Sequence, residues 1–462
     1  MTDTGQRITI VGGGSAGWLA ALALNTRYPE KQITVIASEE IGILGAGEGT
    51  TPFFTKFLSQ LNITAMDIIK YCSGTVKLGI EFKHWRADAK NYFHSFEDLD
   101  GLYYTDKTSS TYSCFTYELA QNKQVPVVLR GDVPCSVSPW ALHFDANLLA
   151  KYLKETALSR GVKYVDARVT KLELSTRGEI IGVRLTSGDV LDTTFLVDCS
   201  GFARLGLGGA YKDLWVSYKK RLPVDTAIPF FIPHDNNVTP VTEAIAMKYG
   251  WVWKIPVRDR YGCGYVFDST QINKEKALAE AEEYFGVPLN SPKEFKFSPG
   301  RYTNTLVKNC LAVGLSQSFI EPLEATSLWT TCTVLDCFLQ HDGINNWRNR
   351  KVSSEVNRVY ADIMDNIVDF VHLHYFTTRK DTEFWRNFAQ NHPMTAEQKR
   401  ALLEIKSGKE TMISPNSLFT RGSWLSVACG IELVDFKNKP SALKETKPCL
   451  THKDLVAFCG ER

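Results

Sequence analysis

Residues 7–24, RITIVGGGSAGWLAALAL, decide the fold of this chain. Apolar and β-branched residues lead into a glycine turn, and a run rich in Ala and Leu follows. This order predicts a strand, a tight turn and a helix. A second apolar run, QITVIAS at 32–38, predicts the next strand and completes a βαβ unit. We therefore expect a Rossmann-like α/β fold.

The turn carries the GxGxxG pattern of dinucleotide-binding proteins. Gly12 suits the tight turn, Gly14 lets the backbone approach a pyrophosphate, and Gly17 lets the helix pack on the strand. Ser15 and Ala16 open the helix, whose N-terminus favours phosphate. The same letters spell the G-x-S-x-G elbow of hydrolases at Ser15. We reject that interpretation, because the elbow follows an internal strand and only one short strand precedes Ser15.

Two features downstream of the turn are candidates for the same dinucleotide. The fingerprint expects an acidic residue at the end of the second strand to bind the ribose. Ala37 and Ser38 occupy that place, so Glu39 is the best candidate. The loop GILGAGEGTTPFF is rich in glycine, and around Gly47 and Glu48 the backbone can pass close to a flat ligand. A surface turn is the alternative for this loop.

Composition indicates an ordinary enzyme with a small partner. The 462 residues are 44% apolar and 23% charged, and 53 basic against 51 acidic residues leave a net charge of +2. No basic block predicts nucleic-acid binding. The sequence has no signal-peptide pattern at its N-terminus and no apolar run long enough for a membrane span, so we expect a cytoplasmic protein. Eleven cysteines without a C-x-x-C pair indicate reduced thiols and no metal site.

At this point the chain resembles the flavin-dependent halogenases of the tryptophan halogenase family. The segments that carry the resemblance are GGGSAGW, GEGTTP, GTVKLGIEF, ALHFDANLLAKYL, FLVDCSGF, GWVWKIP, GYVF and NCLAVGLSQSFIEPLEATS. They occur in the family's order and span about residues 8–328. The resemblance implies a FAD-binding flavoprotein monooxygenase-type fold with an added mixed sheet and a helical C-terminal cap.

The same resemblance implies a reaction and its components. A separate reductase supplies reduced FAD, oxygen and halide give hypohalous acid, and a lysine directs the halogen onto an indole-, phenol- or aniline-like substrate. In this chain the lysine is Lys77 and the family's glutamate is Glu324, while Gly314 and Leu323 join the FAD contacts. A lysine in a dry pocket polarises hypohalous acid by a hydrogen bond or is itself halogenated. A carboxylate stabilises a cationic ring and accepts its proton. The alternatives are a solvated strand lysine and a carboxylate that caps a helix.

The run GWVWKIP is the hallmark of the family, and its spacing has a physical consequence. Trp251 and Trp253 at i and i+2 of a strand share one face and form an aromatic wall. On residue type alone the wall is core filler. The resemblance implies instead that Trp251 and Trp253, with Ile255 and Pro256, separate the flavin from the organic substrate.

The resemblance also implies sites for halide and substrate. Ser318 and Ser327 stand where many relatives carry glycine, so Thr326 and Ser327 are the halide candidates and the choice among chloride, bromide and iodide stays open. His94 and Phe96 form the H-x-F pattern that stacks on indole in tryptophan-specific relatives, with an ordinary aromatic strand as the alternative. The C-terminal region does not clearly reproduce the set that binds the amino-acid part of tryptophan.

Three modules and two rival functions complete the expectations. We expect a discontinuous FAD module from 1–85, 140–211 and 296–345, a substrate-side mixed sheet from 86–139 and 212–295, and a helical cap from 346–462. A flavin-dependent aromatic hydroxylase shares every glycine motif with the halogenase. An inactive FAD-binding protein is the second rival, since the two serine departures permit it. The sequence leaves a homo-oligomer open.

Overall fold

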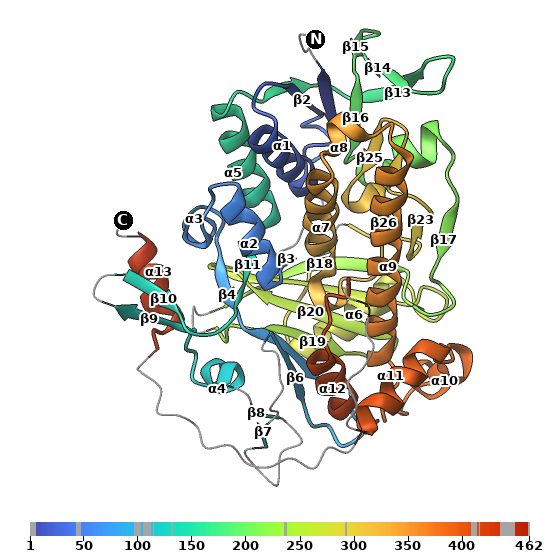
Figure 1. Ribbon diagram of the computed structural model, residues 1–462. Helices are drawn as coiled ribbons and strands as arrows, with labels where there is room; N and C mark the ends of the chain where they lie inside the picture. Colours follow the sequence, from blue (N-terminus) through green and yellow to red (C-terminus); the bar gives the residue numbers. More distant parts are fainter. Residues whose placement is uncertain are drawn as a thin grey trace.

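A computed structural model gives the architecture. It describes residues 6–42, 48–96, 103–104, 112–113, 115–130, 133–234, 238–291, 293–407, 414, 416–434 and 449–460. Two large sheets dominate these residues (Figure 1). The upper sheet in this view contains the N-terminal strand, and the second sheet crosses the middle of the molecule. Together they confirm the expected α/β class.

The upper sheet is the Rossmann-like core. Its strand order is β12-β2-β1-β16-β25-β24, with every pair parallel except β24 and β25. The bounds are β1 Arg7–Val11, β2 Gln32–Ala37, β12 Lys163–Asp166, β16 Phe195–Asp198, β24 Leu306–Val307 and β25 Cys310–Ala312. Helices α1 (Ser15–Arg27) and α5 (Ala146–Ser159) lie beside each other against it. The predicted strand, turn, helix and strand at the N-terminus are all confirmed.

The second sheet is mixed and has seven strands in the order β22-β18-β21-β20-β19-β5-β6. Only the β19 and β5 pair is parallel. The bounds are β5 Gly79–Lys83, β6 Tyr92–Ser95, β18 Thr226–Pro233, β19 Thr242–Ala246, β20 Gly250–Pro256, β21 Arg260–Phe267 and β22 Phe295–Lys296. This is the added mixed sheet that the resemblance implied, and two strands from the first hundred residues extend it.

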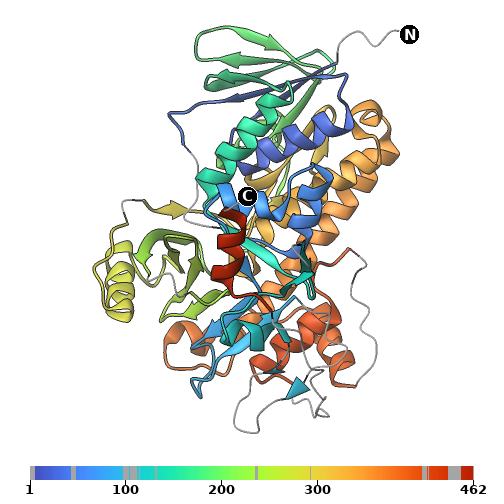
Figure 2. The same ribbon diagram turned by 90° about the vertical axis from the view of Figure 1, so that its left-hand side faces the viewer.

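The two faces of this sheet pack differently because side chains alternate along each strand. On β20, Val252 points to one face and packs in a core cluster with Ala277 and Ala281 of α6 (Lys274–Phe285). Figure 2 shows α6 on the outside of this sheet. The neighbours Trp251 and Trp253 point to the opposite, inner face and line a cavity. The expectation that both indoles share a face is confirmed.

Short sheets and helices fill the remaining space. One three-stranded sheet, β3-β11-β4, lies between the large sheets and carries Lys77. The short strands are β3 Glu48–Gly49, β4 Thr75–Lys77, β7 Tyr103–Tyr104, β8 Tyr112–Ser113, β9 Val127–Arg130, β10 Val133–Ser136, β11 Ala141–Phe144, β13 Val169–Leu174, β14 Ile180–Leu185, β15 Val190–Asp192, β17 Trp215–Ser217, β23 Gly300–Tyr302 and β26 Ser318–Phe319. The short helices of the first half are α2 Pro52–Gln60, α3 Ala65–Tyr71 and α4 Phe115–Gln121.

The described C-terminal part is helical, as the resemblance implied. Helices α7 (Thr326–Gln340) and α9 (Arg350–His374) run side by side along the molecule, and α10 (Glu383–Asn391), α11 (Ala396–Lys406) and α12 (Arg421–Gly430) lie at its lower end in Figure 1. The other two are α8 Gly343–Asn346 and α13 His452–Gly460. Among the described helices, none is long and apolar enough to cross a membrane. The module boundaries at 85, 211, 295 and 345 stay a prediction.

The glycine turn after β1 is fixed by close backbone contacts. Gly12 has φ +118°, and a Cβ there would lie 2.1 Å from the Cys199 carbonyl oxygen. A Cβ on Gly17 would lie 1.9 Å from the carbonyl oxygen of Gly12. In contrast, apart from its chain neighbours, no atom of the described residues lies within 4 Å of the place where a Cβ on Gly14 would stand. Gly12 and Gly17 are therefore required by packing, whereas the space beside Gly14 is open.

This difference predicts two stability phenotypes. Gly17→Ala should lower the free energy of unfolding by about 1–3 kcal/mol, because its methyl group collides with backbone that cannot move aside. Gly14→Ala should cost much less, because its methyl group meets nothing. Thermal and urea unfolding of both variants test this. An equal loss in the two variants would show that the turn is not packed as described.

Candidate active site

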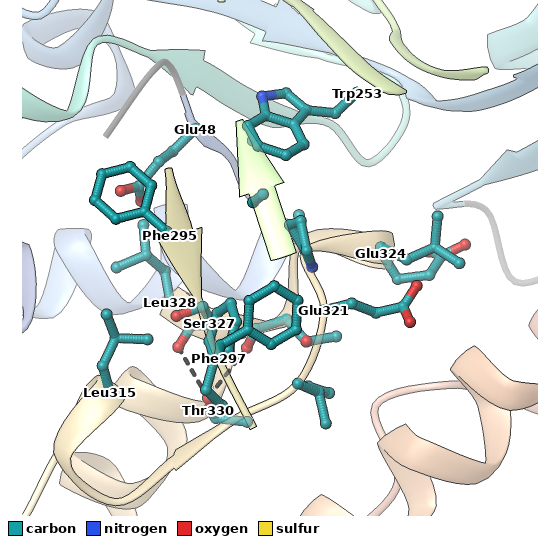
Figure 3. Close-up of a pocket in the computed structure, with 18 of the residues that line it drawn as sticks. Glu48, Trp253, Phe295, Phe297, Leu315, Glu321, Glu324, Ser327, Leu328 and Thr330 are labelled. Carbon is teal, nitrogen blue, oxygen red and sulfur yellow. Dashed lines mark hydrogen bonds between the residues drawn. The ribbon is translucent and has the colours of Figure 1, made fainter. Parts of the chain in front are cut away.

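A cavity of about 270 Å³ lies between the inner face of the seven-stranded sheet and the segment 314–328 (Figure 3). The segment consists of η3 (Gly314–Ser316), β26, η4 (Leu323–Ala325) and the start of α7. The lining residues that matter below are Glu48, Trp251, Trp253, Ile255, Glu321, Leu323, Glu324, Thr326 and Ser327. The expected barrier residues Trp251, Trp253 and Ile255, the glutamate Glu324 and both halide candidates thus line one cavity, whereas Lys77, His94 and Phe96 do not line it.

The Trp wall forms the sheet side of the cavity. Trp251 is buried and Trp253 is half-buried, and their rings meet edge to face with centroids 6.3 Å apart. A Cβ on Gly264, the residue paired with Trp253 on β21, would lie 2.2 Å from the Trp253 ring. Glycine therefore makes room for this indole. Ile255 continues the same face, and the Pro256 carbonyl oxygen accepts a hydrogen bond from Thr75 Oγ1 at 2.6 Å.

Lys77 at the end of β4 is completely buried. Its Nζ donates a hydrogen bond to the Thr50 carbonyl oxygen at 3.0 Å and lies 5.3 Å from the centroid of the Phe96 ring. Burial lowers the pKa of Lys77 to about 8, although the negative charge of Glu324 opposes the change. The alternative of a solvated strand lysine is therefore wrong. Lys77 is a desolvated ammonium that can lose its proton near neutral pH.

A histidine holds the strands around Lys77. His143 of β11 is buried, with Nδ1 3.1 Å from Thr75 Oγ1 and Nε2 2.9 Å from Thr242 Oγ1. Burial and the positive charge of Lys77 lower the pKa of His143 well below its usual range. Its imidazole is therefore neutral. Because His143 is neutral, Lys77 carries the positive charge in this part of the site.

Glu324 is held by two histidines. The residue has φ +68°, a left-handed conformation that directs its buried side chain away from the path of α7. His94 Nδ1 and His374 Nε2 contact its carboxylate at 2.8 and 3.0 Å. Burial alone would raise the pKa of Glu324, but the two histidines lower it well below its usual range. Glu324 is an ionised carboxylate with histidine partners, so the helix-capping alternative is wrong.

The hydrogen bonds of His374 define its charge. Its Nδ1 lies 2.9 Å from the Phe370 carbonyl oxygen, while its Nε2 faces Glu324. Both partners are acceptors, so both nitrogens donate only when the ring is an imidazolium. A buried ion pair between His374 and Glu324 follows from this geometry. His94 packs against Phe370 and Phe419, with ring centroids 5.4 and 6.1 Å away.

The two halide candidates open α7 and line the cavity. Thr326 is buried and Ser327 is exposed. Thr330 Oγ1 donates hydrogen bonds to both of their carbonyl oxygens, at 3.1 and 2.8 Å, as drawn in Figure 3. The first turn of α7 has neither a side-chain cap nor an acidic residue, so the positive end of the helix faces no acid of its own. The ionised carboxylate of Glu324 stands two residues before Thr326, so the helix end is not purely positive, and the halide role of the two residues stays a prediction.

The glycine turn fits the pyrophosphate of FAD. Helix α1 begins at Ser15 without a side-chain cap or an acid in its first turn, and the space beside Gly14 is open. Gly314 has φ +71°, and a Cβ there would lie 2.9 Å from the Cβ of Ala16, so η3 approaches the same helix end. These features leave backbone N–H groups for a phosphate. Leu323, the other FAD candidate of this segment, is buried and lines the cavity.

The remaining FAD candidates differ in their surroundings. Glu39 is exposed just beyond β2 and pairs with Lys154 at 3.1 Å, so its ribose contact stays a prediction. Gly47 lies outside the described residues. Glu48 of β3 lines the cavity, and burial together with the charge of Asp145 raises its pKa to about 7. Among the described residues, no group of three His, Cys, Asp or Glu side chains could hold a metal.

Sequence reasoning missed three side chains that the structure places around the site. They are His143, His374 and Glu321, which accepts hydrogen bonds from Trp251 Nε1 and the Tyr375 hydroxyl at 3.1 and 2.7 Å. His143 and Glu321 lie in segments that carry the family resemblance, whereas His374 lies beyond them. The available signal was an ionisable residue within an otherwise apolar run. Sequence alone does not reveal its partner.

The depressed pKa of Lys77 predicts how stability depends on pH. Lys77 binds its proton with a pKa of about 8 in the folded state and at its ordinary 10.5 when unfolded. Between these values the unfolded state holds more protons, so this residue makes stability rise with pH. Below about pH 8 the charged Lys77 makes the protein less stable than the Lys77→Met variant. We expect this difference in the free energy of unfolding to shrink by about 3 kcal/mol as the pH rises to 10.5.

Urea unfolding of the protein and of Lys77→Met across this pH range measures the difference. Lys83→Met is the matched control. At Lys83, burial acts to lower the pKa, but the carboxylates of Glu243 and Glu81 raise it above its ordinary value. The stability difference between the protein and Lys83→Met should therefore not shrink between pH 8 and pH 10.5. A constant difference between the protein and Lys77→Met would contradict the buried ammonium.

Comparisons with known proteins agree with this site. The family model described as tryptophan halogenase matches residues 7–446. The tryptophan 7-halogenase RebH of Lentzea aerocolonigenes is 32% identical over 419 residues, covering 82% of this chain and 78% of RebH. The 7-chloro-L-tryptophan 6-halogenase KtzR of Kutzneria sp. (strain 744) is 32% identical over 422 residues, covering 82% of this chain and 81% of KtzR.

A solved structure extends the similarity to the whole fold. BrvH, a flavin-dependent halogenase from Brevundimonas sp. BAL3, superposes with a TM-score of 0.82 at 28% identity, covering 99% of this chain and 96% of BrvH. The similarity therefore includes the Rossmann-like sheet, the seven-stranded mixed sheet and the helical C-terminal part. On the match of residues 7–446 and the identity to characterised relatives, the chain belongs to the tryptophan halogenase family of flavin-dependent halogenases.

Proposed function

We propose that Lys77 and Glu324 are the catalytic pair with which this FAD-dependent enzyme halogenates an aromatic small molecule. The observation that carries the proposal is that a buried ammonium, Lys77, lies close enough to the buried, ionised carboxylate of Glu324 for that charge to act on it. Taking both groups out of water is costly and is seldom retained for stability alone. Perturbed ionisable groups at a cavity are typical of active sites.

Lys77 has the properties of a directed hydrogen-bond donor. When bound in reduced form, FAD with oxygen supplies the oxidising power that converts halide to hypohalous acid. Below about pH 8 Lys77 carries its proton and donates to the oxygen of hypohalous acid, which polarises the bond to the halogen. As the aromatic ring attacks the halogen, the oxygen–halogen bond breaks, and that oxygen takes the proton of Lys77 and leaves as water. The low dielectric of the site strengthens this donation.

Glu324 completes the substitution by stabilising the cationic ring and accepting its proton. The ring becomes cationic when it takes the halogen, and a nearby carboxylate stabilises that charge. The same carboxylate then accepts the ring proton, so that substrate and hypohalous acid become halogenated product and water. The contacts from His94 and His374 hold the carboxylate in one orientation, which keeps this step free of rearrangement.

An indole is the substrate class that we propose first. RebH and KtzR are named for tryptophan and chlorotryptophan. Lys77 Nζ lies 5.3 Å from the centroid of the Phe96 ring, and His94 contacts Glu324, which supports an aromatic substrate beside this pair. An aromatic surface beside a directed halogen donor suits a flat, electron-rich ring. Phenols and anilines share that reactivity and belong in the same assay. A separate reductase supplies FADH2, while a cytoplasmic location and a homo-oligomer stay predictions.

Hydroxylation is the competing function on this fold, and the Trp wall is the feature that argues against it. Trp251 and Trp253 lie on the inner face of the sheet at the cavity. We propose that they keep the organic substrate away from the flavin, so that oxygen is transferred to halide. Ile255 and Pro256 extend and end this wall.

Replacement of Lys77 tests the catalytic proposal. Lys77→Ala should lower halogenated product by about a hundredfold or more, because the directing donor is gone, while hypohalous acid still forms. Product is measured by mass spectrometry, and released hypohalous acid is captured with a trapping reagent. Lys83→Ala, which removes a lysine of the neighbouring strand, is the control and should keep its product yield. A normal yield from Lys77→Ala would remove Lys77 from the mechanism.

Removal of one indole tests the barrier. Trp253→Ala should raise the ratio of hydroxylated to halogenated product severalfold, because the half-buried indole can be deleted while Trp251 keeps the core filled. Trp140→Ala, which removes a partly buried indole outside the cavity lining, should leave the ratio unchanged. If Trp253→Ala gives no oxygenated product and unaltered halogenation, the wall is not a barrier.

A further inference from the structure

Glu321 is a second buried carboxyl of the cavity, and the catalytic proposal does not use it. It is 2% exposed and lies three residues before Glu324. Trp251 Nε1 and the Tyr375 hydroxyl both donate to its Oε1, at 3.1 and 2.7 Å. Its Oε2 is buried and has no hydrogen-bond partner among the residues that the structure describes. Figure 3 shows both carboxyl groups on the same side of the cavity.

The two neighbouring carboxyl groups have opposite surroundings. Glu324 is paired with His94 and His374, whereas no Lys, Arg or His among the described residues forms an ion pair with Glu321. The groups that contact Glu321 are a neutral indole from β20 and a neutral phenol that follows α9. The surroundings of Glu324 therefore stabilise an ionised carboxylate, whereas those of Glu321 do not.

The hydrogen bonds of Glu321 suit the protonated form. An ionised carboxylate would leave negative charge on a buried oxygen with no donor, which costs free energy. A carboxylic acid instead keeps Oε1 as the acceptor for both donors and carries its proton on Oε2. In agreement with this, burial raises the pKa of Glu321 to about 8, although the hydrogen bonds from Tyr375 and Trp251 oppose the change.

We propose that Glu321 is a positioning residue, a neutral carboxylic acid that fixes the Trp251 indole through Oε1 and leaves its Oε2 proton available to the cavity. The role rests on the proposed function, because it matters to catalysis only if Trp251 is part of the barrier. A neutral acid also avoids placing a second negative charge where halide and hypohalous acid must pass. Glu321 is neutral and Glu324 is ionised because their contacts differ, and the two carboxyl groups therefore have different roles.

Infrared difference spectroscopy tests the charge of Glu321 without any turnover. The difference between the protein and Glu321→Gln at neutral pH should contain the carbonyl stretch of a carboxylic acid, which a carboxylate lacks. Tyr375→Phe removes one donor to Oε1 and should move this band to higher frequency, which assigns it to Glu321. A difference spectrum with carboxylate bands in place of the acid band would overturn the proposal.

A pair of substitutions tests the positioning role. Glu321→Leu removes the acceptor and should raise the hydroxylated fraction of product or lower halogenation about tenfold. Glu321→Gln keeps an acceptor at Oε1 and a donor at the second position, so it should restore most of the loss. Equal damage in both variants would contradict a neutral acid. If Glu321→Leu does not fold, the comparison of Glu321→Gln with the protein decides, and a loss as large as tenfold contradicts the role.

The two kinds of measurement separate this inference from the proposed function. An acid band in a protein that makes no halogenated product would leave Glu321 as the neutral anchor of Trp251 and reject the halogenase mechanism. Halogenation without the acid band would keep the mechanism and reject the neutral carboxyl.

Discussion

Burial of ionisable groups between the two large sheets is the constraint on which this structure depends. The Lys77 ammonium donates a hydrogen bond to the Thr50 carbonyl oxygen and is partly stabilised by the charge of Glu324, and Glu324 is held in turn by His94 and His374. Buried charges are tolerated only when they are paired and hydrogen-bonded. The short sheet that carries Lys77, the left-handed turn at Glu324 and the end of α9 must therefore fit together, and the site is assembled as the core is packed.

Local patterns predicted what local interactions determine. The strand, turn and helix at residues 7–24 and the shared face of Trp251 and Trp253 follow from spacing along the chain, and both are confirmed. The resemblance named Lys77 and Glu324, but the partner His94 is 230 residues from Glu324 and His374 is 50 residues from it. No periodicity encodes such pairs. For the same reason, the sequence placed residues 79–83 in the expected FAD module, whereas in the structure they form β5, which pairs with β19 of the mixed sheet.

The glycine turns alone do not distinguish a halogenase from a hydroxylase, because both bind FAD. The distinguishing features lie on the inner face of the mixed sheet and on the segment opposite. On that face Gly264 makes room for Trp253, and on the segment Glu321 accepts the Trp251 N–H. Specific function on a shared fold thus depends on a few contacts across one cavity. Those contacts join elements that are far apart in the sequence.

The central claim is that oxygen reaches halide and not the organic substrate. The most direct measurement supplies the purified protein with FAD, a flavin reductase, NADH, bromide and isotopically heavy oxygen gas, together with a panel of indoles, phenols and anilines. Mass spectrometry then follows both labels in each product. The account predicts a product with the bromine isotope doublet and no heavy oxygen. A product that contains heavy oxygen without bromine would make the protein a monooxygenase and return Trp251 and Trp253 to the role of core.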